Sequence, residues 1–242
     1  MVTKEFEYFT NQIEKKYRNL LGLKWGWRFS YGPKETFYNN NGILLIGLNP
    51  GGGQESRTDI LPSFEKGNAY LFEEWGYAPG KNPLQRQVIT LFKGVADRIS
   101  SDYVELMNHS FTSNIIPFRS PRLERLPHKK EIVLFSKNLW DELSDIVNPN
   151  VVITIGNSST CSAYSILREI YSKKGFEIDE EEIPINWGNY KTYAAKLRKD
   201  EKEITIVGLP HLSTFRFIER DSSRDATNII VEKIAAKLER SD

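Results

Sequence analysis

Apolar and polar positions form two kinds of pattern along the chain, a helical period and continuous apolar runs. A helical period predicts helices over residues 3–21, 84–99, 129–147, 158–173 and 223–239. Continuous apolar runs predict buried strands at 43–48, 111–116, 150–156 and 203–210. Because strands and helices alternate, we expect a three-layer α/β/α sandwich around a four-stranded parallel sheet. The chain then forms a single domain, 1–242, with long irregular insertions at 51–83 and 176–202.

Composition narrows the class of protein without naming a function. A net charge of +1 and 39% hydrophobic residues are ordinary for a globular protein. The single cysteine, Cys161, excludes an internal disulfide and a cysteine-ligated zinc or iron–sulfur cluster. The first residues lack the apolar core of a signal peptide, and no apolar run reaches the length of a membrane span. We therefore expect a reduced intracellular protein, cytoplasmic or nucleoid-associated, that is monomeric and has no membrane contact.

Polar residues gather where the predicted strands end, which is where open α/β sheets bind ligands. The four ends read GLNPGGG at 47–53, NIIPFRSP at 114–121, GNSST at 156–160 and GLPHLSTF at 208–215. The first end lacks the Gly-Lys-Ser/Thr of a nucleotide phosphate loop and the fingerprint of a dinucleotide loop. Asn49, Asn114 and His211 are therefore expected on one rim of the sheet. For each, a purely structural role is the competing interpretation, Asn49 in a local turn and Asn114 as a satisfied buried amide.

Three of these segments resemble motifs of the uracil-DNA glycosylase superfamily. GLNPGGG is similar to the G-[IM]-N-P-G motif of its mismatch-specific, thymine-type and single-strand-selective members, and GLPHLSTF resembles the H-P-S or H-x-S motif. TSNIIPF at 112–118 is similar to the strand that carries a base-reading asparagine. The resemblance covers about 42–216 and rests on short motifs. It implies a monofunctional DNA glycosylase that flips a base, needs no metal or other cofactor, and serves base excision repair.

The resemblance also assigns roles to residues. Asn49 aligns with the residue that positions the attacking water, and His211 with the donor that stabilises the anionic leaving base. Asn114 aligns with the amide that pairs with the base edge. The remaining base contacts are expected from Gly47, Leu48, Gly51 and an aromatic ring, for which we choose Phe64 over Tyr70, Phe72 and Trp75.

Two departures from the family pattern bear on specificity. Uracil-specific relatives carry a catalytic Asp and, after the proline, a bulky Tyr, whereas this chain has Asn49 and Gly51. Gly51 leaves space beside C5 of a pyrimidine, so the pocket is expected to admit thymine or larger modified bases. In the second motif, Pro210 precedes His211 instead of following it, and the backbone of that loop is expected to differ.

DNA contacts are expected from three segments. The last loop offers a wedge and a charge, and its residues are Leu212, Ser213, Phe215 and Arg216, while Phe217 is assigned to the core. Ser158 and Ser159 offer hydroxyls at a helix N-terminus to phosphate, although either of them, or Asn157, is equally suited to be a plain cap of that helix. The basic run RSPRLERLPHKK at 119–130, with Arg119 and Arg122, either binds the duplex or is a solvated face.

Other functions remain open at this point. A glycosylase for bulky modified pyrimidines, such as those of phage DNA, would use the two insertions as extra walls. A nucleic-acid-binding module of the same fold would have lost catalysis, which the presence of Asn49 and His211 disfavours. An unrelated α/β hydrolase is disfavoured because G-x-S-x-G is lacking and Cys161 is expected inside a helix.

Overall fold

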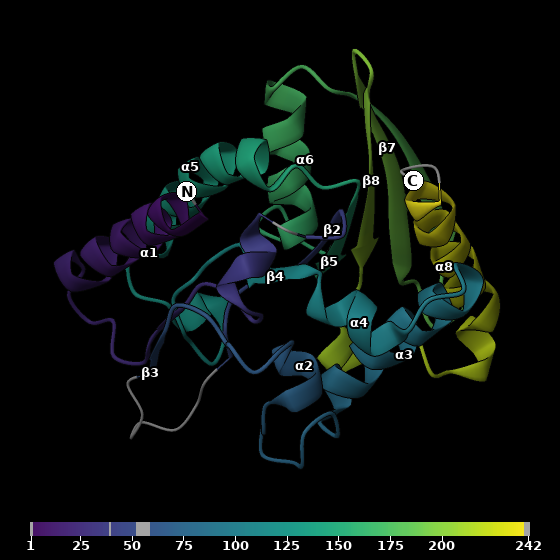
Figure 1. The fold of residues 1–242 in the computed structure, drawn as a ribbon, viewed down its shortest axis with the longest axis horizontal. Helices are drawn as coiled ribbons and strands as arrows, with labels where there is room; N and C mark the ends of the chain where they lie inside the picture. Colours follow the sequence, from purple (N-terminus) through teal and green to yellow (C-terminus); the bar gives the residue numbers. More distant parts are fainter. Residues whose placement is uncertain (1, 39, 52–58, 240–242) are drawn as a thin grey trace.

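A six-stranded mixed sheet forms the centre of the molecule in this computed structural model, which describes residues 2–38, 40–51 and 59–239 (Figure 1). The strand order is β4-β2-β5-β8-β7-β6. Strands β4, β2, β5 and β8 are parallel, whereas β7 and β6 are antiparallel to their neighbours. The bounds are β2 (Ile43–Gly47), β4 (Phe111–Asn114), β5 (Val151–Ile155), β6 (Glu177–Pro184), β7 (Lys191–Lys199) and β8 (Lys202–Leu209).

The α/β class and the four parallel strands are confirmed, but the expected strand number was wrong. The segment 176–202, expected to be irregular, forms the β6–β7 hairpin. Strand β6 reads EIDEEEIP and lies at the sheet edge, where Ile183 is its buried residue. An edge strand that faces water on one side has no continuous apolar run, so the hydrophobic pattern did not reveal it.

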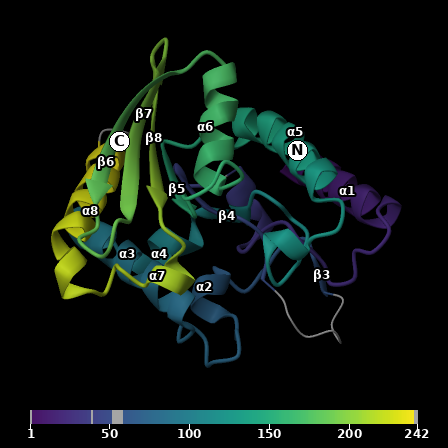
Figure 2. The ribbon, with the colours of Figure 1, turned by 180° about the vertical axis from the view of Figure 1, so that it is seen from behind.

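Helices cover both faces of the sheet (Figures 1 and 2). One face packs against α1, α5 and α6, and the other against α3, α4 and α8. Strand β2 divides its side chains accordingly, because Leu44 and Ile46 join the first core while Ile43 and Leu45 join the second. The bounds are α1 (Val2–Asn19), α3 (Pro83–Arg98), α4 (Tyr103–Asn108), α5 (Lys129–Val147), α6 (Ala163–Lys173) and α8 (Arg224–Leu238).

Smaller elements frame the carboxyl end of the parallel strands. Two short parallel strands, β1 (Gly26–Arg28) and β3 (Asp59–Leu61), form a separate sheet. The short helices are α2 (Ala69–Phe72), α7 (Leu212–Phe215), η1 (Lys34–Phe37), η2 (Leu123–Arg125) and η3 (Asp221–Ser223). The part of the insertion 51–83 that the structure describes therefore contains β3 and α2 as well as loops.

Helix α6 begins later than expected. Its N-cap is Ser162, whose hydroxyl accepts a hydrogen bond from the Ser165 backbone at 3.2 Å. The prediction that Asn157, Ser158 or Ser159 caps this helix was wrong, because the chain makes a further turn before the helix starts. Cys161 lies in that turn, half-buried, and not inside the helix as expected.

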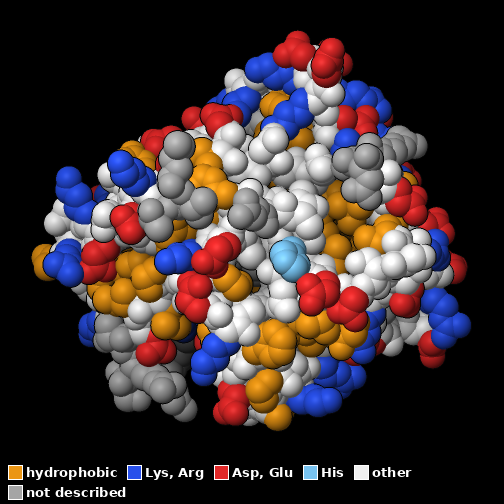
Figure 3. All heavy atoms as spheres, viewed as in Figure 1, with side chains coloured by type: hydrophobic (Ala, Val, Ile, Leu, Met, Phe, Trp, Pro, Cys, Tyr) orange, Lys and Arg blue, Asp and Glu red, His pale blue; other side chains and the backbone are white. Residues whose placement is uncertain are grey.

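The surface carries no evident segregation of charge on the face shown in Figure 3, where basic and acidic side chains are interspersed. Within the described ranges, no helix combines the length and apolarity needed to cross a membrane.

Candidate functional site

A cavity of about 590 Å³ opens where β2, β4 and β8 end. Its wall includes the three polar residues that the strand ends predicted, Asn49, Asn114 and His211. They come from segments separated by 65 and 97 residues of chain, and the parallel sheet brings their strand ends to one edge. The volume lies in the ordinary range for small-molecule sites.

Asn49 is held by a loop that follows β4. Its Nδ2 donates to the backbone oxygen and the hydroxyl of Ser120, both at 3.2 Å, and to the Pro50 oxygen at 3.1 Å. Ser120 is fully buried, and its hydroxyl donates onward to the Arg122 oxygen at 2.8 Å. Since the nitrogen serves protein acceptors, the Oδ1 of Asn49 is the atom suited to accept a hydrogen bond from water.

Asn114 and Gly47 are neighbours in register on strands β4 and β2. A Cβ atom on Gly47 would lie 2.2 Å from the Oδ1 of Asn114, so the amide lies directly over the glycine. Asn114 is buried, and its amide lies near the Tyr31 phenol, whose pKa is raised by burial and partly lowered by this amide. The Trp140 indole donates to the Asn114 and Ile115 oxygens at 3.3 and 3.0 Å and fixes the end of the strand.

His211 is the N-cap residue of α7 and lies at the rim of the cavity. Its Nδ1 is 2.8 Å from the Ser213 hydroxyl, which also lines the cavity. The residue is exposed to solvent, yet the protein around the ring desolvates it enough to lower the pKa of His211 below its ordinary value. A neutral imidazole is therefore favoured, and a Ser213 hydroxyl that donates to Nδ1 leaves Nε2–H as a donor.

Three aromatic rings form the apolar wall. Tyr31, Tyr70 and Trp75 line the cavity and pack together, with ring centroids of Tyr70 and Trp75 4.9 Å apart. Burial raises the pKa of Tyr31 and of Tyr70, so both phenols are neutral at physiological pH. The expected stacking residue, Phe64, does not line the cavity, and neither does Phe72. Tyr70 and Trp75, the rival candidates, do.

A buried arginine, Arg28, lines the same cavity and packs against this wall. The Arg28 guanidinium lies 3.9 Å from the Tyr31 ring centroid, with Phe64 further away at 5.7 Å. Its Nη1 donates to Glu73 Oε2 at 2.6 Å, and the same carboxylate accepts from the Trp75 indole at 2.8 Å. Arg28 is 2% exposed, so this ion pair links two of the aromatic walls through a largely dry interior.

Gly51 and Arg119 form part of the cavity mouth. Among the residues that the structure describes, nothing lies within 4 Å of a Cβ built on Gly51, and its φ is not in the left-handed region, so neither a described neighbour nor backbone geometry demands glycine there. Arg119 Nη1 donates to the Gly51 oxygen at 3.2 Å, while its buried Nε meets no acceptor among the residues described. Gly52 and Gly53, the rest of the predicted turn, lie outside the described residues.

The residues expected to contact DNA differ in their exposure to solvent. Leu212 is fully buried in the core beside Phe217, so it was wrongly assigned to an exposed wedge. Phe215 is half-buried and Arg216 is exposed. Ser158 and Ser159 are exposed in a turn but offer no helix N-terminus, and Arg122 is exposed on the basic run. Leu48 and Gly47 line the cavity as expected.

Sequence reasoning missed three residues of the site. Arg28 is the last residue of β1, and Tyr31 lies in the loop after it. A strand of three residues gives no periodic signal in the sequence. Ser120 was treated only as part of the basic run 119–130. It also belongs to NIIPFRSP, the segment at the end of the second predicted strand, and that position pointed to the site. The position of a residue relative to a strand end was therefore the better guide.

A second, smaller cavity of about 230 Å³ lies between α8 and strands β6–β8. Its charged side chains pair with one another, as Lys233 does with Glu181 at 2.6 Å, so we place the functional site at the strand ends. Across the described ranges, no group of three or more His, Cys, Asp or Glu residues is arranged to hold a metal ion. No protein-family model matches this chain, and no curated protein matches it in sequence.

Proposed function

We propose that this protein is a DNA glycosylase that hydrolyses the N-glycosidic bond of uracil or of a 5-modified pyrimidine flipped out of DNA. The proposal is carried by one observation, the convergence of Asn49, Asn114 and His211 on a single cavity with aromatic walls. These three residues belong to three short motifs that resemble those of the uracil-DNA glycosylase superfamily. The parallel sheet alone brings these strand ends to one edge. The resemblance requires in addition that all three polar side chains line one cavity beside aromatic rings, which is the arrangement present here.

Each side chain has a role that fits its surroundings. Asn49, held through Nδ2, offers Oδ1 to a water that attacks C1′ of the sugar while the bond to the base breaks. The electron pair of that bond leaves with the base, whose oxygen gains negative charge, and the proton that the water loses on bonding to C1′ neutralises the released base. His211, neutral and at the rim, donates a hydrogen bond to that oxygen. Asn114 presents one amide donor and one acceptor to the base edge, and a ring of the Tyr31, Tyr70 and Trp75 wall lies against its face.

The space at the mouth favours a base with a substituent. The cavity of about 590 Å³ is much larger than a pyrimidine ring, and the position of Gly51 is open. A bulkier side chain at this position would occupy the room that a C5 group needs. We therefore propose 5-substituted pyrimidines as the preferred substrates within this reaction class.

The test is single-turnover base release from oligonucleotides that carry uracil, thymine in a mismatch, or a 5-modified pyrimidine, with alkali cleavage to reveal abasic sites. Asn49→Ala and His211→Ala should each reduce the rate by about 10²–10³. Both should still bind the oligonucleotide, because phosphate contacts dominate affinity. His109→Ala is the matched control, since His109 is an exposed histidine at the C-cap of α4 that does not line the cavity.

Two outcomes would reject the proposal. If the wild-type protein binds DNA tightly and releases no base from any substrate, a binding module of the same fold explains the site better. If Asn49→Ala and His211→Ala retain full activity, the assigned roles are wrong and the two residues are structural.

A further inference from the structure

An exposed aromatic cluster lies beside α7, formed by Trp187, Tyr190 and Phe215. The ring centroids of Tyr190 and Phe215 are 4.3 Å apart, and Trp187 lies 5.6 Å from Tyr190 and 5.7 Å from Phe215. Tyr190 is 44% exposed, and the other two rings are half-buried. The fold therefore leaves part of the apolar surface of three large rings exposed to water.

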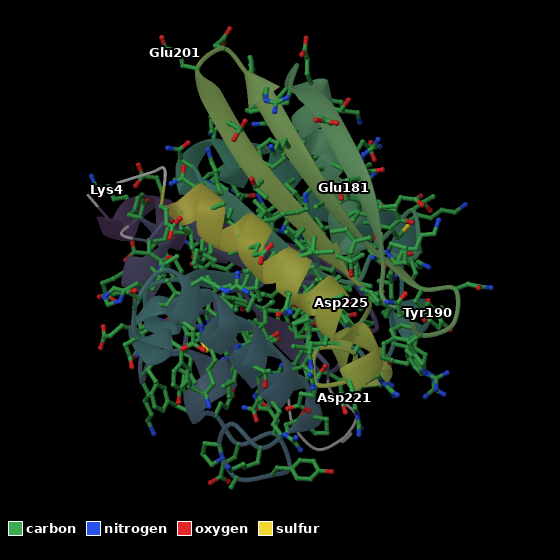
Figure 4. All side chains as sticks on the ribbon, turned by 90° about the vertical axis from the view of Figure 1, so that its right-hand side faces the viewer. Lys4, Glu181, Tyr190, Glu201, Asp221 and Asp225 are labelled. Carbon is green, nitrogen blue, oxygen red and sulfur yellow. The ribbon has the colours of Figure 1, made fainter. Side chains whose placement is uncertain are left out.

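Two elements that are distant in sequence build this aromatic cluster. Trp187 and Tyr190 belong to the β6–β7 turn, which closes through the Ile185 backbone N–H donating to the Tyr190 oxygen at 3.3 Å. Asn186 and Gly188 have positive φ values of 54° and 57°, which give the turn its shape. In Figure 4 the turn that carries Tyr190 projects from the body of the molecule, away from the sheet.

Positive charge accompanies the rings. The Arg220 guanidinium lies 4.2 Å from the Trp187 ring centroid, and its Nε donates to the Phe215 oxygen at 3.4 Å. Arg216 is exposed at the C-cap of α7. Neither arginine has a carboxylate partner within the described part of the chain, whereas the nearby Asp221 pairs with Arg224. Rings interleaved with unpaired arginines are the features that bind single-stranded nucleic acid.

The aromatic cluster lies next to the cavity. His211 and Ser213 line the cavity, and Phe215 ends the same short helix. At 1.5 Å of rise per residue, His211 and Phe215 are separated by about 6 Å along the helix axis. That distance is close to the spacing of neighbouring nucleotides along a strand, so one strand is able to reach both places.

We infer that the aromatic cluster stacks on an unpaired base adjacent to the one in the cavity, and that the protein therefore prefers single-stranded or locally opened DNA. The inference rests on the proposed function for the identity of its partner. In an intact duplex, neighbouring bases cover each other's faces, so only an unstacked base offers a free face to a ring. Arg216 and Arg220 face the phosphates on either side of that base.

The experiment compares binding of one fluorescein-labelled sequence as a single strand and as a duplex, by fluorescence anisotropy. Tyr190→Ala should weaken single-strand binding about tenfold, the loss of one stacking contact, and should change duplex binding much less. Tyr190→Phe keeps the ring and should bind as the wild type does. Tyr8→Ala is the control, because Tyr8 is 47% exposed and belongs to α1, which Figure 2 shows well away from α7.

Arg220→Gln provides a second readout that leaves all three rings in place. It should reduce the slope of log affinity against log salt by about one for single strands. Unchanged binding by Tyr190→Ala and an unchanged slope for Arg220→Gln would overturn the inference. Equal losses on single strand and duplex would also overturn it, since the rings would then not be selecting unpaired bases.

The inference and the proposed function fail separately. Binding requires no catalysis, so the tenfold loss by Tyr190→Ala supports the aromatic cluster even if no oligonucleotide loses a base. Conversely, if Tyr190→Ala binds single strands as tightly as the wild type while base release proceeds, the glycosylase proposal remains intact and the stacking role is removed.

Discussion

Replacing Gly47 by alanine is the sharpest perturbation that the site offers. The new Cβ would lie 2.2 Å from the Oδ1 of Asn114, and since Cβ atoms essentially never approach within 3.0 Å, the amide must retreat by at least about 0.8 Å. Asn114 is buried, with the Trp140 indole on its backbone oxygen, so the side chain has little room to move. The displacement moves the amide out of its place beside the Tyr31 phenol.

The magnitude follows from two costs. Forcing a buried amide away from its polar surroundings costs about 1–3 kcal/mol, and overpacking a tight contact costs a similar amount. We expect Gly47→Ala to lower the free energy of unfolding by about 2–4 kcal/mol, and the melting temperature by roughly 6–12 °C for a chain of this size. If Asn114 reads the base, discrimination between uracil and cytosine in base release should also fall by about 10–100-fold.

A double-mutant cycle separates this mechanism from a general effect of the methyl group. In an Asn114→Ala background the clashing oxygen is gone, so Gly47→Ala should then cost less than about 1 kcal/mol by urea denaturation. Gly51→Ala, the same change four residues along the chain, meets open space and should cost less than about 0.5 kcal/mol. An equal cost of Gly47→Ala in both backgrounds would refute the reasoning.

Three further predictions follow from the cavity. Gly51→Tyr should reduce release of 5-substituted bases more than release of uracil, because the ring fills an open space; equal losses on all bases in single-turnover assays would contradict this. Arg28→Met should cost about 2–4 kcal/mol in thermal denaturation because Glu73 loses its buried partner, whereas Arg98→Met, in an exposed pair with Glu232, should cost less than about 1 kcal/mol. The lowered pKa of His211 means that the unfolded chain takes up this proton more readily, so its contribution reduces stability as the pH falls below the ordinary value of about 6.5. His211→Gln should remove that part of the acid destabilisation in melting curves, and base release by the wild type should stay constant with pH until His211 itself is protonated.

The hydrophobic pattern was sufficient to predict the helices and strands that are buried on a broad face. Helix α5 begins and ends at Lys129 and Val147 as predicted, and β2 and β5 lie inside the predicted runs, because elements buried on a broad face must carry a regular apolar pattern. Strands β6 and β7 escaped because charged residues occupy the solvent face of an edge hairpin. The strands β1 and β3 are too short for any period to be visible.

The site divides in the same way. Asn49, Asn114 and His211 could be predicted because each lies at or just after the end of a predicted strand, and parallel strands bring their ends to one edge of the sheet. The aromatic wall was predicted less well. Phe64 was chosen over Tyr70 and Trp75, and Tyr31 was not considered, because the short helix α2 and the loop after β1 are positioned by tertiary contacts. The misassignment of Leu212 has the same origin. In a four-residue helix, sequence does not show which side faces the core.

Strand β8 runs from a turn remote from the cavity to the edge of the cavity itself. At one end it leads to His211 and the cavity, and at the other it begins at the turn that carries Glu201, which Figure 4 shows far from Tyr190. A tether or dye attached through Glu201→Cys, with Cys161 replaced by serine, would thus leave the cavity and the aromatic cluster free. The turn provides a natural anchoring point for holding single molecules on a surface while DNA strands come and go at the opposite end.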